Sequence, residues 1–241
     1  MENDRNYLIK SVINQSINIK HRKKRIQPSA WLPEPVATEQ ADTDINRREV
    51  LTYSMLVLLE HLNARERAVF ILKEAFDYSH DEIAEILSMS IGNSRKLLSR
   101  AKSKLSASEQ IGVDSSFDTA AYLERYISVI KNGDTRALEK LLSEEVLYTA
   151  DGGGRIKVVS EFNVGIAEVA RQVSYVYQHF QKKLLIRTAT VNHQPALLFY
   201  RDNTLITCQV FELEVSRDQP AKIRRIFTVV DPDKLKTFNL V

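Results

Sequence analysis

Residues 78–106 read YSHDEIAEILSMSIGNSRKLLSRAKSKLS, and this stretch decides the fold of the first half of the chain. In its first part, four apolar residues recur at helical spacing behind Ser79, whose hydroxyl can cap the free amides of a first helical turn. The segment SMSIG then interrupts the apolar pattern, and Gly92 and Asn93 tolerate the backbone geometry of a turn or a cap. The pattern predicts two short helices joined by a tight turn.

The second of these helices is basic on one face and apolar on the other. Positions 92–106 contain no acidic residue. Two helices joined by a short turn, with the second one basic, have the geometry of a DNA-reading helix-turn-helix. Side chains placed to reach base edges are Asn93, Arg95, Lys96 and Ser99, and those suited to phosphate are Arg100, Lys102 and Lys104. A solvated basic helix of some other helical bundle is the alternative interpretation.

The bulk composition is that of an ordinary globular protein. The 241 residues suggest about two domains, and 44% hydrophobic content allows a sizeable core. Cys208 is the single cysteine, which excludes an internal disulfide and a cysteine-based zinc site. We expect no metal and no cofactor. Without a long apolar run or a secretory signal pattern, the sequence predicts a cytoplasmic protein with no membrane partner.

The charge alternates along the chain although the net charge is only +3. Residues 1–26 hold seven Lys or Arg against two acids, and residues 27–46 hold four acids and no Lys or Arg. The basic run at 21–25 suits phosphate contact as well as a solvated helix end, and the sequence leaves both interpretations open.

The order of patterns predicts several domains. Residues 5–25 read as one amphipathic helix, and three prolines make 27–46 a linker. Trp31, the only tryptophan, is expected to dock on a domain. Helices at 48–62 and 64–75 complete a four-helix unit over 47–108, and periodicity is lost between 106 and 116.

The remainder, 117–241, predicts an α+β domain in which a curved antiparallel sheet is wrapped on helices. The expected helices are 117–131, 134–142 and 164–180. The expected strands are 146–150, 156–162, 184–191, 195–200, 205–215 and 222–230.

At this point the residues resemble a known family. Residues 47–106 resemble region 4 of an extracytoplasmic-function sigma factor of the sigma-70 family. The linker motif WLPEP, the turn DGGG at 151–154 and the near-terminal DPDKL at 231–235 resemble the SigJ-like subgroup, in which a SnoaL-like domain, a cone of α+β fold, follows region 4.

The resemblance implies a factor for transcription initiation whose partners are the RNA polymerase core and promoter DNA, and which is not an enzyme. It assigns recognition of the −35 promoter element to Gly92, Asn93, Arg95, Lys96, Ser99 and Arg100, with Lys102 beside them. It assigns contact between the C-terminal domain and the sigma part to Trp31, Pro33, Glu34, Pro35, Asp151, Gly152, Gly153, Gly154, Asp231, Pro232, Asp233, Lys234 and Leu235. Asp231 replaces the subgroup's usual asparagine, a change that could alter docking.

Residues 1–26 resemble only the last helix of sigma region 2, so most of that region is missing from the sequence as given. The resemblance therefore leaves three alternatives, which are a truncated sequence, a sigma factor whose region 2 comes from a separate protein, and a decayed gene. An accessory or antagonistic protein that binds polymerase without melting the −10 element is a further alternative.

An enzyme or a ligand sensor joined to a DNA-binding module is the remaining alternative, because some SnoaL-like cones use Asp and His in acid/base chemistry. The available groups are Tyr148, Asp151, His179, His193, Tyr200 and Asp202. None has diagnostic spacing, and no pair forms a defensible acid and base. The sequence therefore predicts no catalytic residue.

Overall fold

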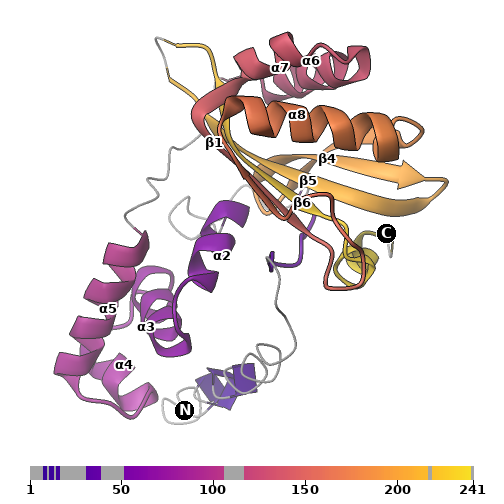
Figure 1. Ribbon diagram of the computed structural model, residues 1–241. Coiled ribbons are helices and arrows are strands. Elements are labelled where there is room, and N and C mark those ends of the chain that lie inside the picture. The colour runs from indigo at the N-terminus through magenta and orange to yellow at the C-terminus, as the bar shows by residue number, and fades with distance from the viewer. Residues whose placement is uncertain are drawn as a thin grey trace. The chain divides into compact units, whose positions relative to one another are not determined.

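A computed structural model describes residues 8, 9, 11–13, 15, 16, 31–38, 52–105, 117–216 and 219–239. The chain forms two compact units (Figure 1). Of the described residues, the first unit contains those between 8 and 16 and 55–105, and the second contains 31–38, 52–54 and 117–239. The predicted basic run at 21–25 lies outside the described residues, and the domain boundaries expected from the sequence stay a prediction.

The first unit is helical. Its helices are α2 (Tyr53–Glu60), α3 (Ala64–Glu74), α4 (His80–Ile86) and α5 (Ile91–Leu105), and the described residues between 8 and 16 are helical as well. Helix α2 starts in the second unit with Tyr53 and Ser54 and continues into the first. The predicted cap at Ser79 is confirmed, since its hydroxyl accepts from the backbone N–H of Glu82, whose side chain accepts from Ser79 in return.

The turn between α4 and α5 is shorter than the sequence predicted. Helix α5 begins at Ile91, so Gly92 and Asn93 lie in its first turn rather than in the connection. Ser90 makes this early start feasible, because its hydroxyl accepts from the N–H of Asn93. The left-handed residue of the connection is Ser88, with φ of 50°. The expectation that Gly92 supplies turn geometry is therefore wrong.

The second unit is an α+β domain with one six-stranded sheet. The chain runs through α6 (Thr119–Asn132), α7 (Thr135–Leu141), β1 (Leu142–Asp151), β2 (Phe162–Val164), α8 (Ile166–Val176) and the π-helix η1 (Tyr177–Gln181). It continues through β3 (Leu185–Val191), β4 (Gln194–Arg201), β5 (Thr204–Glu214), β6 (Lys222–Val229), α9 (Pro232–Leu235) and the 3₁₀-helix η2 (Lys236–Asn239).

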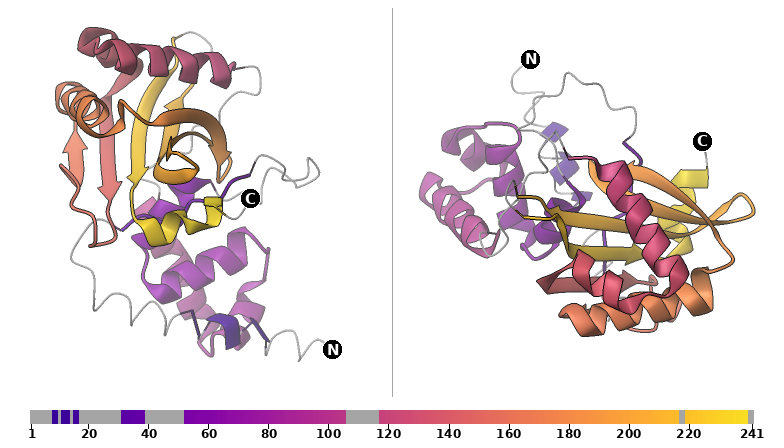
Figure 2. Two further views of the ribbon diagram at one scale, coloured as in Figure 1. Left: turned by 90° about the vertical axis from the view of Figure 1, so that its right-hand side faces the viewer. Right: turned by 90° about the horizontal axis from the view of Figure 1, so that it is seen from above.

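The sheet is curved and unclosed, and its order is β2-β1-β6-β5-β4-β3. Helices α6, α7 and α8 lie on one face of it (Figures 1 and 2). The predicted antiparallel pairing holds for four of the five strand pairs described, whereas β1 pairs with β6 in parallel. Alternation of buried and exposed residues is the same in both kinds of pair, so the sequence pattern could not reveal this exception.

One predicted strand is much shorter than expected. Of the segment 156–162, only Phe162 pairs with β1, as the first residue of β2. The N–H groups of Arg155 and Ile156 both bond to the carbonyl of Gly152 and close a tight turn. The turn therefore uses the N–H groups of Arg155 and Ile156, which are not available to pair with a neighbouring strand. The strand prediction is wrong at this end of the segment.

Both faces of the sheet carry buried side chains. The face under the helices holds the main core, in which the rings of Tyr126 and Phe211 lie 5.0 Å apart. On the other face, the ring of Tyr53 lies 5.4 Å from that of Phe227, and helix α9 contacts β5. Segments distant in sequence therefore build a second, smaller core. Within the described ranges, no helix combines the length and the apolar character that crossing a membrane requires.

Candidate functional site

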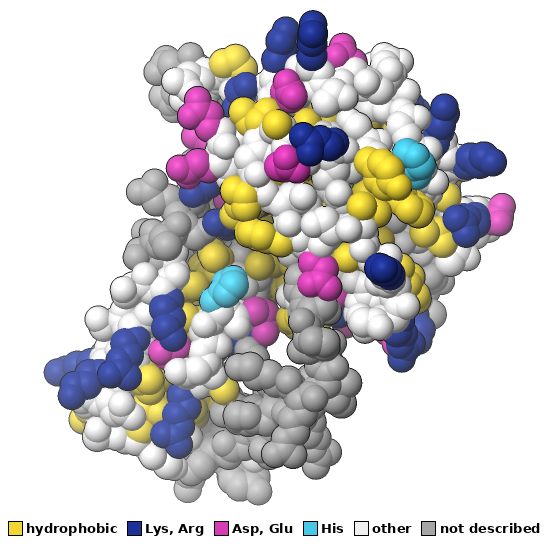
Figure 3. Space-filling view, viewed as in Figure 1, with side chains coloured by type: hydrophobic (Ala, Val, Ile, Leu, Met, Phe, Trp, Pro, Cys, Tyr) yellow, Lys and Arg dark blue, Asp and Glu magenta, His cyan; other side chains and the backbone are white. Residues whose placement is uncertain are grey.

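Helix α5 separates its apolar residues from its polar ones by face. Its buried residues are Ser94, Leu97, Leu98, Ala101 and Leu105. Of the predicted DNA-binding residues, Gly92, Arg95, Lys96, Ser99, Arg100 and Lys102 are exposed, and Asn93 is half-buried. Lys and Arg side chains gather over this part of the first unit (Figure 3). The helix therefore presents one continuous polar and cationic face to solvent.

Contacts with neighbouring helices fix how α5 is held. The Nδ1 atom of His80, on α4, lies 2.9 Å from the hydroxyl of the fully buried Ser94. Lys104 pairs with Glu66 of α3 at 2.7 Å, and Lys102 pairs with Glu74 at 2.9 Å. Two cations that the sequence suited to phosphate are thus engaged inside the unit.

Glu66 is the most buried of these charged groups, with a side chain 3% exposed. Burial raises the pKa of a carboxyl, but the hydrogen bonds from Lys104 and from the backbone of Asn63 outweigh it and leave the pKa of Glu66 below its ordinary value. The same carboxylate completes the capping box of α3 with Asn63. Glu66 therefore joins the start of α3 to the end of α5.

The other three cations on the exposed face of α5 are not engaged in ion pairs of this kind with other described residues. Among the residues that the structure describes, Arg95, Lys96 and Arg100 form no ion pair within 4.0 Å. A methyl group added to Gly92 would meet no atom within 4 Å. Space beside Gly92 at the start of α5 is thus open, and the exposed cations Arg95, Lys96 and Arg100 follow it along the helix.

The predicted contact motifs of the second unit meet at Asp151, the last residue of β1. Its carboxylate is 1% exposed. One oxygen accepts from the N–H of Leu32 at 2.8 Å, and the other accepts from the N–H of Gly153 at 2.7 Å. The linker motif and the glycine turn therefore share one buried carboxylate.

Lys234, on α9, completes this arrangement. Its ammonium group pairs with Asp151, donates to the carbonyl oxygen of Leu32 at 2.6 Å and lies 4.3 Å from the centre of the Trp31 ring. A cation over an indole face is attracted by the negative charge density of the ring. The three motifs that carried the family resemblance are thus in contact through one ion pair.

The glycine turn is needed because other atoms approach it closely. A Cβ atom on Gly153 would lie 2.1 Å from a carboxylate oxygen of Asp231, and one on Gly152 would lie 1.9 Å from the carbonyl oxygen of Ile156. Gly153 also has φ of 62°, a conformation that residues with side chains rarely adopt. Asp231 caps α9 by accepting from the N–H of Asp233.

The other predicted residues of these motifs divide by burial. Pro33, Pro35 and Leu235 are buried, and Glu34 is exposed. Asp233 pairs with Arg155 at 2.6 Å, and Pro232 occupies the first turn of α9.

A second set of contacts binds the end of the linker to the turn between β3 and β4. Val36 and Asn192 exchange bonds, in which the side-chain oxygen of Asn192 accepts from the N–H of Val36 and the N–H of Asn192 bonds to the carbonyl of Val36, both at 2.9 Å. The N–H of Thr38 bonds to the carbonyl of Thr190, and Ala37 bridges to Val191. Residues 36–38 thus pair with the end of the edge strand β3.

The start of α2 binds at the same place. The N–H of Tyr53 bonds to the carbonyl of Asn192, and that of Ser54 bonds to the side chain of Gln194. The hydroxyl of Tyr53 donates to the carbonyl of Pro33 at 2.8 Å. Burial raises the pKa of Tyr53 well above its ordinary value, with Cys208 and Asp151 adding to the shift, so the hydroxyl remains a donor.

We call these contacts of residues 31–38 and of the start of α2 the linker-binding site. Sequence reasoning missed Tyr53, Asn192 and Gln194 as members of it. The pair Asn192 and His193 was a visible turn signal in the sequence, because Asn favours such two-residue hairpin turns. In the structure both residues have positive φ. Nothing in the local pattern indicated that the turn would also bind a segment more than 150 positions earlier.

The groups weighed for catalysis do not converge. His193 and Asp202 lie in the turns at opposite ends of the eight-residue strand β4 and are exposed. Tyr148 is buried, and Asp151 is occupied by Lys234 and Leu32. His179 is exposed and stacks on Tyr175 at 4.0 Å. None of these placements offers an acid and a base to one substrate.

Comparison with known proteins gives similarities to sigma factors. Residues 52–105 match the family model described as Sigma-70, region 4. A stretch of 167 residues is 29% identical to the ECF RNA polymerase sigma factor SigJ of Mycobacterium tuberculosis (strain ATCC 25618 / H37Rv) and covers 66% of this chain. That stretch covers 53% of SigJ, so this chain spans about half the length of that relative.

Two further likenesses extend over most of the chain. The probable ECF RNA polymerase sigma factor SigI of Mycobacterium tuberculosis (strain CDC 1551 / Oshkosh) is 23% identical over 245 residues, covering 98% of this chain and 79% of SigI. The crystal structure of the Mycobacterium tuberculosis extracytoplasmic function sigma factor SigJ matches with a TM-score of 0.68 at 23% identity, covering 88% of this chain and 76% of that one. Residues 52–105 thus match sigma-70 region 4, the chain is similar in sequence to extracytoplasmic-function sigma factors, and its fold resembles that of the SigJ structure.

Proposed function

We propose that the protein acts in transcription initiation as a sigma factor, with region 4 recognising the −35 promoter element and contacting the RNA polymerase core. The observation that carries the proposal is the face of α5, where Arg95, Lys96 and Arg100 stand exposed beside the open backbone of Gly92. Side chains near the start of a recognition helix reach base edges, and later cations contact phosphate. The names of the relatives support the same role.

Binding of the full chain to promoter DNA tests this role. The probe is a fluorescent duplex taken from upstream of the protein's own gene, titrated at low salt and followed by anisotropy. Arg95→Ala and Lys96→Ala are each expected to weaken binding by about tenfold, the effect of losing one good contact to a base edge or phosphate. Arg136→Ala, an exposed arginine on α7, is the control and should leave the affinity unchanged. Equal affinity for all these variants would exclude α5 as the DNA-reading element.

We also propose that the second unit controls region 4 through the linker-binding site. Tyr53 and Ser54 are the first residues of α2 and lie at the start of the segment matched to region 4; the linker-binding site holds both of them, and the helix continues into the first unit. Lys234→Ala should therefore change the affinity for promoter DNA or for the polymerase core, whereas Lys236→Ala, at an exposed neighbour, should change neither. Unchanged binding of both partners by Lys234→Ala would refute control through this site. The alternative of a separate region 2 protein has no support in the comparisons.

A further inference from the structure

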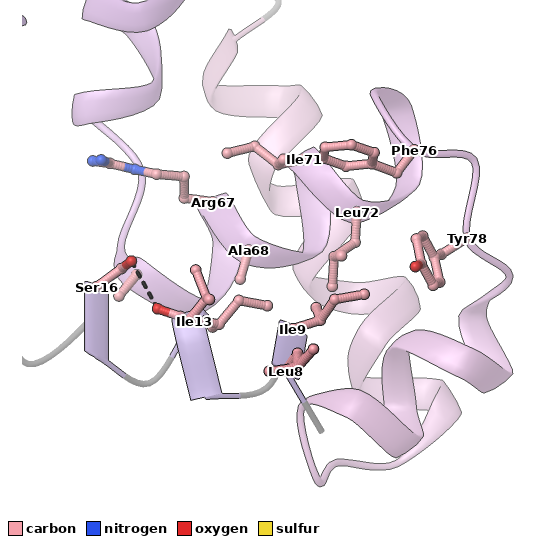
Figure 4. A pocket seen from close by; sticks show the side chains of 12 residues that line it. Leu8, Ile9, Ile13, Ser16, Arg67, Ala68, Ile71, Leu72, Phe76 and Tyr78 are labelled. Carbon is pink, nitrogen blue, oxygen red and sulfur yellow. Dashed lines mark hydrogen bonds between the residues drawn. The ribbon is translucent and has the colours of Figure 1, made fainter. Parts of the chain in front are cut away.

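Exposed apolar surface occurs in both units. Figure 4 shows a hollow between the helical residues 8–16 and α3, where the guanidinium of Arg67 points away from the apolar walls. Those walls do not indicate the chemistry of an occupant. In the second unit, by contrast, hydrophobic side chains gather beside a histidine with Lys and Arg side chains around them (Figure 3).

The exposed rings of the second unit lie at the end of α8 and in the π-helix η1. They belong to Tyr175, His179 and Phe180. Tyr175 is 45% exposed and Phe180 is 57% exposed. The ring centres of Tyr175 and His179 are 4.0 Å apart, and those of Tyr175 and Phe180 are 6.3 Å apart. Large apolar side chains that gather in solvent are typical of interaction sites.

The backbone of this segment holds the rings in place. Nδ1 of His179 lies 2.8 Å from the carbonyl oxygen of Tyr175, and the planes of the two rings differ by 26°. The N–H of Lys182 bonds to the carbonyl of Tyr177 at 2.8 Å, which closes a π-turn. Such turns are rare in helices and are frequent at functional sites. The stacked rings therefore form a preformed surface for a flat ligand.

Positive charge surrounds these rings. Residues 169–201 contain five Lys or Arg and no acidic residue. Lys182 and Lys183 directly follow η1 and are exposed. Strand β3 begins two residues after Lys183, and the antiparallel strand β4 ends at Arg201, so these two cations lie at the same end of the sheet. With the other described residues, Lys182, Lys183 and Arg201 form no ion pair within 4.0 Å.

Acidic side chains lie at two borders of this area. Glu139 of α7 lines a hollow beside the rings, and Asp202 lies in the turn after β4. An anionic chain is therefore favoured over Lys182 and Lys183 rather than toward α7 or that turn. We call the following residues the aromatic-cationic surface: Tyr175, His179, Phe180, Lys182, Lys183 and Arg201.

We propose that the aromatic-cationic surface binds single-stranded DNA, with unpaired bases stacked on Tyr175 and Phe180 and phosphates on the cations. Proteins that bind single strands combine exposed aromatic rings, on which bases stack, with cations that contact the backbone. A duplex hides the faces of its bases and cannot use the rings. An acidic peptide would use the lysines and leave the rings in water.

The choice of DNA rather than RNA rests on the proposed function, because promoter strands separate when transcription starts. The aromatic-cationic surface belongs to the second unit, whereas promoter recognition is assigned to α5 in the first. Variants of the two units therefore test the two proposals separately.

Anisotropy titration of the full chain tests the ligand. The probe is a fluorescent oligothymidylate of about 15 nucleotides, a length within the usual site size for single strands. It should bind saturably, and polyglutamate of the same length should displace it only at a concentration at least about tenfold higher, because only the nucleic acid uses the rings.

Variants locate the binding on the surface. Phe180→Ala should weaken oligothymidylate binding by about tenfold, the effect of losing one stacked base, and Phe180→Tyr should retain binding because the ring is kept. Phe180 is 57% exposed, so folding does not depend on its ring. Binding of the promoter duplex should be the same in Phe180→Ala as in the unmodified chain, which checks that region 4 is intact.

The two lysines are tested by salt dependence. Replacing Lys182 and Lys183 together by Ala should reduce the slope of the logarithm of the binding constant against the logarithm of salt concentration by about 1.4, since each phosphate of a single strand contributes about 0.7. Arg136→Ala, at an exposed position on α7, is the control and should change neither the affinity nor the slope.

Absence of saturable oligothymidylate binding overturns the proposal, and so does equal affinity of Phe180→Ala and the unmodified chain. Weaker binding in Arg95→Ala but not in Phe180→Ala would place the strand on α5 instead. Tighter binding of an oligouridylate of the same length would contradict the choice of DNA. If vesicles containing phosphatidylglycerol bind and oligothymidylate does not, the surface is a membrane contact and the proposal is wrong. Unchanged binding of the promoter duplex by Arg95→Ala contradicts only the proposed role of region 4.

Discussion

The ammonium nitrogen of Lys234 lies 2.6 Å from the carbonyl oxygen of Leu32, a residue 202 positions earlier in the chain. The same ammonium pairs with the buried Asp151, whose carboxylate accepts from the N–H of Leu32. Leu32 is thus held at its N–H by an anion and at its carbonyl by the matching cation. This reciprocal arrangement explains why the linker folds as part of the second unit although its sequence lacks helical or strand periodicity.

Lys234→Ala should release the linker. Removing the cation leaves the carboxylate of Asp151 buried without its partner, which typically costs about 3–5 kcal/mol. Trp31, the only tryptophan, lies against this cation, so its fluorescence emission should shift to longer wavelength as water reaches the ring. Lys236→Ala should leave the emission unchanged because Lys236 pairs only with the exposed Asp233. Identical spectra for both variants would contradict the proposed role of Lys234.

Gly153→Ala should be far more damaging than Gly154→Ala. Both glycines have positive φ, which costs a residue with a side chain about 1 kcal/mol. Only at Gly153 does the new methyl group meet a neighbour, the carboxylate of Asp231. We expect about 1 kcal/mol of destabilisation for Gly154→Ala and at least about 2 kcal/mol more for Gly153→Ala, measured by urea unfolding. Equal losses would mean that Asp231 moves aside at little cost.

The pair between Glu66 and Lys104 predicts a specific acid sensitivity of the first unit. Because the pKa of Glu66 is lower in the folded chain, its contribution is fully present above the ordinary glutamate pKa and is lost as the pH falls through the lowered value. Glu66→Gln keeps the capping box, since Gln also serves at that position, but removes the charge. It should cost about 1–2 kcal/mol at pH 7 and less once the pH has fallen below the lowered pKa of Glu66.

Helical circular dichroism during thermal unfolding at several pH values measures this effect. Asp77→Asn is the control, because Asp77 is almost fully exposed in its pair with Lys73 and Asn tolerates its positive φ. A pH dependence of Glu66→Gln equal to that of the unmodified chain would show that Glu66 is not the group responsible.

Much of the first unit could be predicted because its signals are local. Ser79 and Glu82 stand three residues apart and form the capping box that starts α4, and the spacing of Leu97, Leu98 and Ala101 predicts the buried face of α5. The start of α5 was misplaced because Gly92 looks like a turn residue, whereas Ser90 caps the helix one residue before it begins.

The contacts between distant segments could not be predicted in the same way. Lys102 and Lys104 look like Arg95 and Arg100 in the sequence, and only the fold reveals that acids of α3 engage the two lysines. The bond between Tyr53 and Pro33 likewise depends on both segments reaching the same face of the sheet, which no local pattern encodes. Motif resemblance indicated that the linker, the glycine turn and the terminal segment belong together, but not which atoms join them.

The cations of α5 should therefore contribute unequally to the salt dependence of promoter binding. The logarithm of the binding constant falls with the logarithm of salt concentration by about 0.9 for each phosphate neutralised. Arg100→Ala should reduce this slope by about 0.9, because Arg100 is exposed and forms no ion pair among the described residues. Lys104→Ala should leave the slope unchanged, since Lys104 is committed to Glu66, and should instead lower the melting temperature. Anisotropy titrations between about 50 and 200 mM salt measure the slopes. A slope reduced equally by both substitutions would show that Lys104 leaves Glu66 to contact DNA, and would contradict the division of the helix into a DNA-facing part and an internally paired part.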